Sequence, residues 1–138
     1  MDIWHEMNCW NKYLAYKLGP IANDATFHIE LCENPGWWVK INLTGTPFAE
    51  CRFDEISHNV DANRFQTSPT DWYHCSVKDK KFDGAGDPDK LEFILTTFFN
   101  WLKQNGYVTK EWTPDDIPVI SSCYPQPENT QFPESENS

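Results

Sequence analysis

The chain has 138 residues, of which 39% are hydrophobic and 15% aromatic, and a formal net charge of −10. This length predicts one domain with enough apolar material to bury a core. The acidic balance argues against direct binding of nucleic acid, which needs clustered Lys and Arg. It permits a basic protein partner, although the same charge also keeps an ordinary acidic protein in solution.

No stretch approaches the roughly 18 apolar residues of a membrane span. The first residues, with Asp2 and Glu6 beside Trp4, lack the basic start and apolar centre of a signal peptide. Five scattered cysteines without CxxC spacing are typical of reduced thiols. We therefore expect a cytoplasmic protein that makes no contact with a membrane.

The first eighteen positions carry apolar residues at spacings of three and four, which predicts a helix over residues 2–18. Asp2 is the expected N-cap, and Gly19-Pro20 ends the helix. The apolar stripe consists of Ile3, Met7, Trp10, Leu14 and Leu18.

Apolar and polar residues then alternate on both sides of Asn34-Pro35-Gly36. Proline fixes φ at one corner of a tight turn, and glycine accepts the positive φ that the next corner can require. The pattern predicts a β-hairpin with one buried face. That face carries Phe27, Ile29, Leu31, Trp37, Val39, Ile41 and Leu43.

Two more alternating stretches predict strands over residues 48–56 and 71–78, and residues 107–112 also suit a short extended piece. After residue 78, residues 79–87 are predicted to form a charged loop in which Gly84-Ala85-Gly86 leads flexibly into a helix. Asp87 is the expected cap of that helix, Pro88 its first residue, and Asn105-Gly106 its end. The prediction is an α+β fold with a four-stranded or five-stranded antiparallel sheet and two helices packed on it.

Domain organisation follows from composition. Residues 1–112 are expected to form a single α+β domain. Residues 113–138 hold five of the ten prolines, several acids and no basic residue, which predicts a mobile acidic tail.

The histidines, His5, His28, His58 and His74, show no spacing typical of metal ligands. His28 and His74 both face outward from predicted strands, so neighbouring strands could build a metal site from them, the basis of a small metal-dependent enzyme or binding module. We find no catalytic motif, and the glycines before the second helix lack the Lys of a phosphate-binding loop. The sequence therefore predicts no enzyme, no metal and no cofactor.

The outward side of the predicted sheet carries Trp38 and Trp72. The N-terminal helix either buries these rings or packs beside the second helix and leaves them as an exposed patch for a partner. Acidic residues would surround such a patch. The candidate partner-binding residues are Glu30, Glu33, Trp38, Asp54, Glu55, Asp61, Asp71 and Trp72.

Three blocks occur in order: the Asn34-Pro35-Gly36-Trp37 turn with the strand after it, the Asp71-Trp72 pair, and Phe82-x-Gly84-x-Gly86-Asp87-Pro88 before the second helix. Together they resemble the Immunity protein 53 family. The likeness covers residues 27–102 and the helix that contains Trp10. Ile21-Ala22-Asn23 departs from the family pattern of Trp-Glu-His, and the C-terminal tail lies outside the likeness.

The resemblance implies a bacterial protein that is not an enzyme and is encoded beside a polymorphic toxin. Such a protein binds its toxin and occludes the toxin's active site in the cell that makes both. Many toxins of this kind are basic nucleases, which would match an acidic surface. The resemblance transfers no binding residue to this chain.

Overall fold

A computed structural model describes residues 1–33 and 35–117. Helix α1 (Ile3–Lys12) begins at Asp2, whose side chain accepts a hydrogen bond from the backbone N–H of His5 at 3.2 Å. The helix continues as a π-helical stretch (Tyr13–Leu18) and a 3₁₀ turn (Gly19–Ala22). The predicted cap is confirmed, and helical structure reaches Leu18 as predicted, but the α-helix itself ends at Lys12 and Gly19-Pro20 lies in the 3₁₀ turn.

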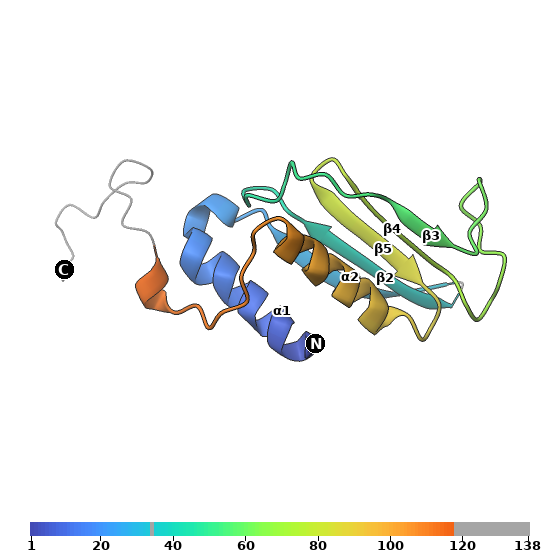
Figure 1. The fold of residues 1–138 in the computed structure, drawn as a ribbon, viewed down its shortest axis with the longest axis horizontal. Helices are drawn as coiled ribbons and strands as arrows, with labels where there is room; N and C mark the ends of the chain where they lie inside the picture. Colours follow the sequence, from blue (N-terminus) through green and yellow to red (C-terminus); the bar gives the residue numbers. More distant parts are fainter. Residues whose placement is uncertain (34, 118–138) are drawn as a thin grey trace.

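The sheet contains five strands: β1 (Thr26–Cys32), β2 (Gly36–Asn42), β3 (Ile56–His58), β4 (Tyr73–Lys78) and β5 (Lys81–Gly86). Their order is β1-β2-β5-β4-β3, and each neighbouring pair is antiparallel (Figure 1). The α+β prediction is confirmed, and β1 and β2 form the predicted hairpin. Asn34, within the predicted turn, lies outside the described residues.

The fifth strand is not the one that the sequence indicated. Residues 81–86, read as a loop, form β5 in the middle of the sheet, between β2 and β4. Asp79 and Lys80 join β4 to β5 with φ values of 54° and 66°. This two-residue turn has the positive φ angles of a tight hairpin without the usual Asn-Gly signal, and that is why the pattern was missed.

The strand predicted over residues 48–56 is wrong in all but its last residue. Residues 48–50 form a turn, and β3 begins only at Ile56. Phe48 and Phe53 nevertheless pack against the core. The indole nitrogen of Trp101 donates a hydrogen bond to the carbonyl of Arg52 at 2.7 Å, so this irregular segment is fixed by helix α2 (Leu91–Gln104).

Helix α2 lies close to the sheet because β5 turns glycines toward it. A Cβ placed on Gly84 would lie 2.5 Å from the Cγ2 methyl of Ile94 in α2, and one placed on Gly86 would lie 2.7 Å from Cβ of Lys90. The glycines that read as a flexible lead-in are therefore contact positions under the helix.

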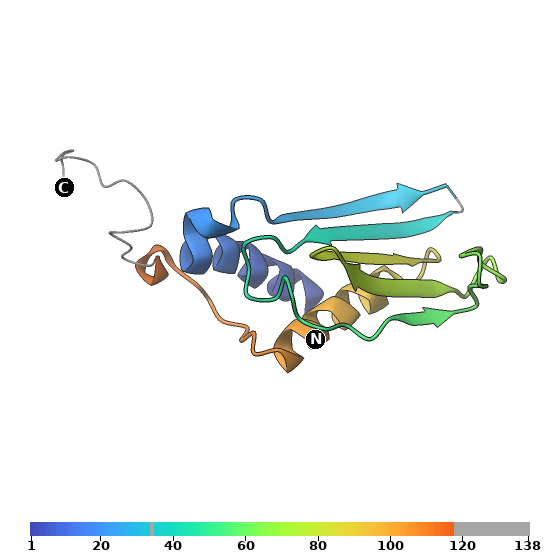
Figure 2. The ribbon, with the colours of Figure 1, turned by 90° about the horizontal axis from the view of Figure 1, so that it is seen from above.

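Both helices cover one side of the sheet (Figure 2). Helix α2 contacts β2 and β5, and α1 packs beside α2. Trp10 of α1 lies at the centre of the aromatic core, with ring centroids 5.8 Å from Phe98 of α2 and 5.5 Å from Tyr107. Of the hairpin face predicted to be buried, Val39 and Ile41 are fully buried, whereas Leu31 is exposed.

A buried ion pair fixes the start of α2. Asp87 is fully buried and accepts hydrogen bonds from the ammonium of Lys90 at 2.7 Å and the backbone N–H of Trp72 at 2.9 Å. The predicted N-cap of α2 is wrong: the N-cap is Lys90, and Asp87 lies about one turn before the helix. Lys90 also donates to Asp71 at 2.9 Å. These bonds tie the helix start to the beginning of β4.

The end of the described chain returns to the N-terminal region, where a 3₁₀ turn (Pro114–Asp116) lies against the π-helical stretch. Its first residue follows Thr113, whose side chain accepts a hydrogen bond from the N–H of Asp115. The predicted mobile tail lies outside the described residues from residue 118 onward.

Substitution Gly84→Ala is expected to destabilise the fold by about 2 kcal/mol, because the new methyl overpacks a rigid contact with α2. The cost should fall in an Ile94→Ala background, which lacks the opposing Cγ2 methyl. Urea unfolding of the four variants measures this coupling. An equal cost in both backgrounds would contradict the close contact.

Substitution Asp87→Asn is expected to cost about 3 kcal/mol at pH 7, because it leaves the Lys90 ammonium without its buried partner. Burial raises the pKa of Asp87, but hydrogen bonds from Lys90 and from the backbone N–H groups of Asp89 and Trp72 outweigh it and lower the pKa below its ordinary value of 3.8. The stabilisation is therefore complete above that value and lost as the pH falls through the lower folded pKa.

Unfolding measured at several pH values checks this: the difference between wild type and Asp87→Asn should shrink in acid. The control is Asp71→Asn, which removes an exposed partner of the same lysine and should cost less. An Asp87→Asn deficit that stays constant down to pH 2 would rule out the ion pair as its cause.

Candidate functional site

The side of the sheet opposite the helices is called the open face here. Paired residues of neighbouring strands point to the same side, so the register identifies its members. Glu30, Trp38, Ala85, His74 and Ser57 form one row across all five strands. The other outward positions are Thr26, His28, Cys32, Lys40, Asn42, Ser76, Lys78, Lys81 and Asp83.

Trp38 is the large aromatic residue that this face presents, with 37% of its surface exposed. Its indole nitrogen donates a hydrogen bond to Asp83 at 2.7 Å, and the ammonium of Lys40 lies 3.6 Å from the ring centroid. Lys40 also lies 3.7 Å from a carboxylate oxygen of Glu30. The ring is therefore held in one orientation before any partner arrives, which lowers the entropy cost of binding.

A second polar group lies toward the β3 edge of the open face. His74 Nε2 and a carboxylate oxygen of Glu55 are 2.7 Å apart, and the other oxygen of Glu55 lies 3.8 Å from Lys78. The hydrogen bond with His74 lowers the pKa of Glu55 below its ordinary value. Glu55 is thus a fixed negative charge at neutral pH.

A shallow hollow of about 250 Å³ lies on the open face where β1, β2 and β5 meet. Its lining includes His28, Lys40, Lys81 and Asp83. Side chains of both charges and an imidazole therefore surround a space large enough for one side chain of a partner.

The structure divides the eight predicted partner-binding residues into groups. Glu30, Trp38 and Glu55 lie on or beside the open face. Asp54 lies on the other side, in a groove that Trp101 of α2 also lines. Trp72 is 95% buried, so its ring is not available to a partner.

The remaining three lie along the end of the sheet where β1, β3 and β5 finish, with Glu33 and Asp61 at its opposite edges. Glu33 follows β1 and is exposed. Asp61 shapes the loop after β3, since one of its oxygens accepts hydrogen bonds from the N–H groups of Asn63 and Phe65. Asp71 accepts from Lys90 and contacts His58. This acidic end, defined by Glu33, Asp61 and Asp71, borders the open face.

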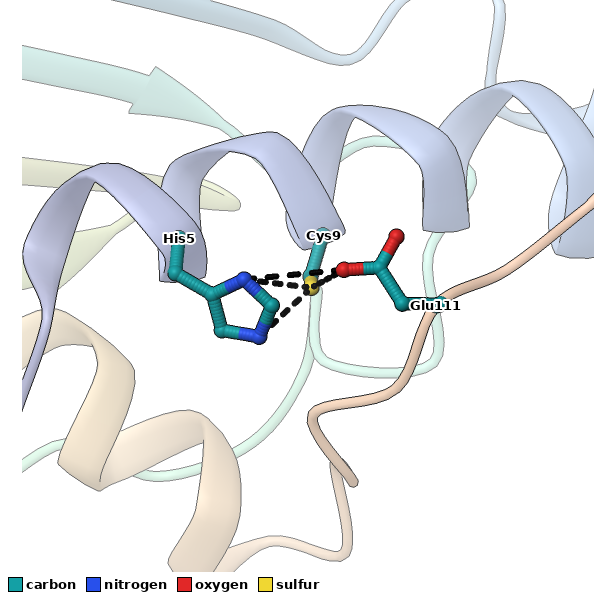
Figure 3. A group of neighbouring side chains, drawn as sticks. All are labelled: His5, Cys9 and Glu111. Carbon is teal, nitrogen blue, oxygen red and sulfur yellow. Dashed lines mark hydrogen bonds and ion pairs between the residues drawn. The ribbon is translucent and has the colours of Figure 1, made fainter.

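The metal hypothesis based on His28 and His74 is not supported, because β2 and β5 separate the strands that carry them. Sequence reasoning missed a different cluster: His5 and Cys9 of α1 meet Glu111 (Figure 3). The spacing of four residues between His5 and Cys9 on a predicted helix was the available signal. Nothing in the sequence placed Glu111 beside them.

The titration of this cluster follows from its contacts. Burial and the nearby Glu111 carboxylate raise the pKa of the Cys9 thiol. The hydrogen bond from Lys12 at 2.8 Å lowers the pKa of Glu111. Cys9 is 0% exposed and protonated at neutral pH, so it is unsuited to act as a nucleophile.

A family model described as Immunity protein 53 matches residues 10–103. No curated protein matches, and no solved structure matches. Within the described part of the chain, no helix has the length and apolar character needed to cross a membrane.

Proposed function

We propose that this chain, which belongs to the Immunity protein 53 family, binds its cognate toxin through the open face and the acidic end. Membership of the family supports an immunity function and a toxin partner. The further parts of the proposal concern the surface, the class of toxin and the mechanism. The protein acts in the cytoplasm of the cell that makes the toxin, occludes the toxin's active site and converts no substrate.

One observation carries the choice of surface: both helices pack on one side of the sheet and leave the other side with a fixed, partly exposed tryptophan. Buried aromatic anchors surrounded by polar contacts dominate the energy of protein interfaces. Trp38 has this character, because Asp83 and Lys40 hold the ring while its edge stays accessible.

The size of the open face explains why the acidic end belongs to the same surface. Five strands about 4.8 Å apart and six residues of about 3.3 Å give a projected area of about 400 Å². A stable interface covers about 800 Å² on each partner. The projected area and the buried accessible surface are different measures, but the sheet alone is small for such an interface, and exposed loops with Glu33 and Asp61 add surface at its end.

The charge supports a basic toxin of the nuclease type. Residues 1–117 carry eighteen acidic and eleven basic side chains. On the open face itself Lys40 is paired with Glu30 and Lys78 with Glu55, so its local charge is nearly balanced. The excess of acid then acts mainly at long range, where it speeds the encounter with a basic partner.

Substitution Trp38→Ala is expected to weaken binding of the toxin encoded beside this chain by about 2 kcal/mol or more, about 30-fold in Kd. Trp4→Ala is the matched control, because Trp4 is 72% exposed on α1, away from the open face. Titration calorimetry gives both affinities, and thermal unfolding checks that each variant is folded. Wild-type affinity of Trp38→Ala, with or without a loss in Trp4→Ala, would contradict the proposed surface.

Double reversal of Glu30 and Glu33 to Lys is expected to slow association with the toxin about tenfold at low salt and to flatten its salt dependence. The control reverses Asp24, before β1, and Asp115, in the 3₁₀ turn, which changes the net charge equally. Stopped-flow association rates at several salt concentrations measure the effect. Equal slowing in both double variants would mean that only the net charge matters and not the position of Glu30 and Glu33.

A further inference from the structure

The cluster of His5, Cys9 and Glu111 lies outside the surface proposed for the toxin. The two helix residues are one turn apart, so their side chains lie on one face of α1, and Glu111 approaches them from the segment after α2 (Figure 3). Thiol, imidazole and carboxylate are the three side-chain groups that bind Zn²⁺ in proteins.

The distances between the ligand atoms fit one ion. Cys9 Sγ lies 4.0 Å from His5 Nδ1 and 3.8 Å from Glu111 Oε2, and His5 Nδ1 lies 3.5 Å from the same oxygen. Bond lengths of about 2.0 to 2.3 Å in a tetrahedron require ligand separations of about 3.3 to 3.6 Å. The sulfur lies nearer to His5 Nε2, at 3.6 Å, than to Nδ1, so the imidazole must also turn. With that rotation of an exposed side chain, shifts of a few tenths of an ångström bring all three atoms to Zn²⁺.

Contacts outside the cluster place the carboxylate independently of any ion. Lys12 holds the other oxygen of Glu111 at 2.8 Å, which leaves Oε2 directed at the thiol and the imidazole. Glu6, one turn before Trp10, accepts hydrogen bonds from Thr109 and Lys103, both at 2.7 Å, and so fixes the segment that leads to Glu111. Such surrounding bonds are what orient metal ligands in proteins.

The three residues differ in solvent exposure. Cys9 is fully buried, whereas the side chains of His5 and Glu111 are 48% and 61% exposed. An ion could enter from the solvent side and reach the sulfur, and water would occupy the fourth position. The buried sulfur is not accessible to a substrate, so this geometry does not fit a nucleophilic triad.

We propose that His5, Cys9 and Glu111 bind one Zn²⁺ that clamps the segment after α2 onto α1. Binding forms a bond from the Cys9 sulfur to the ion and releases the thiol proton to solvent. The clamp joins chain positions about a hundred residues apart, so it should stabilise the contact between the C-terminal segment and the first helix.

The test uses the full chain, freed of metal with a chelator and titrated with Zn²⁺ and with Co²⁺. Wild type should bind one Zn²⁺, show a thiolate-to-Co²⁺ absorption band, and gain thermal stability as Zn²⁺ increases. His5→Gln and Glu111→Gln, both at exposed positions, should each weaken binding at least about tenfold, and Cys9→Ser should abolish the Co²⁺ band.

The matched controls are His28→Gln and Cys51→Ser, which alter the same residue types elsewhere and should leave binding unchanged. If Cys9→Ser fails to fold, Zn²⁺ binding by His5→Gln and Glu111→Gln still tests the proposal. No Zn²⁺ binding by wild type, or unchanged binding in both His5→Gln and Glu111→Gln, would overturn the proposal. The test does not involve the toxin, so its outcome is independent of the function proposed for the open face.

Discussion

The architecture depends on the close contact between helix α2 and two glycines of β5, Gly84 and Gly86. Because Gly84 and Gly86 have no side chain, Ile94 and Lys90 approach the strand directly. The helix can then lie low on the sheet, and Trp10 of α1 reaches Phe98 along its side. Both helices therefore pack on the same face of the sheet. The opposite face of the sheet remains free, and the buried pair of Asp87 and Lys90 holds α2 in this position.

The open face combines an anchored aromatic ring with charged side chains that are already paired. It presents a large aromatic ring, and that ring is fixed by a hydrogen bond and a cation–π contact. Its charges are already paired across strands, so a partner meets an ordered pattern of donors and acceptors. Preorganisation of this kind favours tight and selective binding. Under the proposed function, the excess acid at the sheet end attracts a basic partner at long range.

Much of the fold was predictable from periodicity, including both helices, the first hairpin and the strand that became β4. β5 was not, because its turn, Asp79-Lys80, carries no glycine and its own glycines read as loop. For the candidate site, alternation placed Trp38, Glu30 and His74 on the outward side correctly. Burial or exposure of Trp72 was left open and the structure buries it, since alternation alone does not show whether an outward ring is covered. The meeting of Glu111 with α1 is a contact over a hundred residues, which no local pattern encodes.

The most direct test of the central claim is oxidative footprinting of the tryptophans, free and in complex with the cognate toxin. In the free protein both Trp38 and Trp4 are accessible, at 37% and 72% exposure. The proposed surface predicts that the toxin protects Trp38 from labelling and leaves Trp4 unchanged. Protection of Trp4 with full labelling of Trp38 would show that the toxin binds the helix side, and the open face would have no part in immunity.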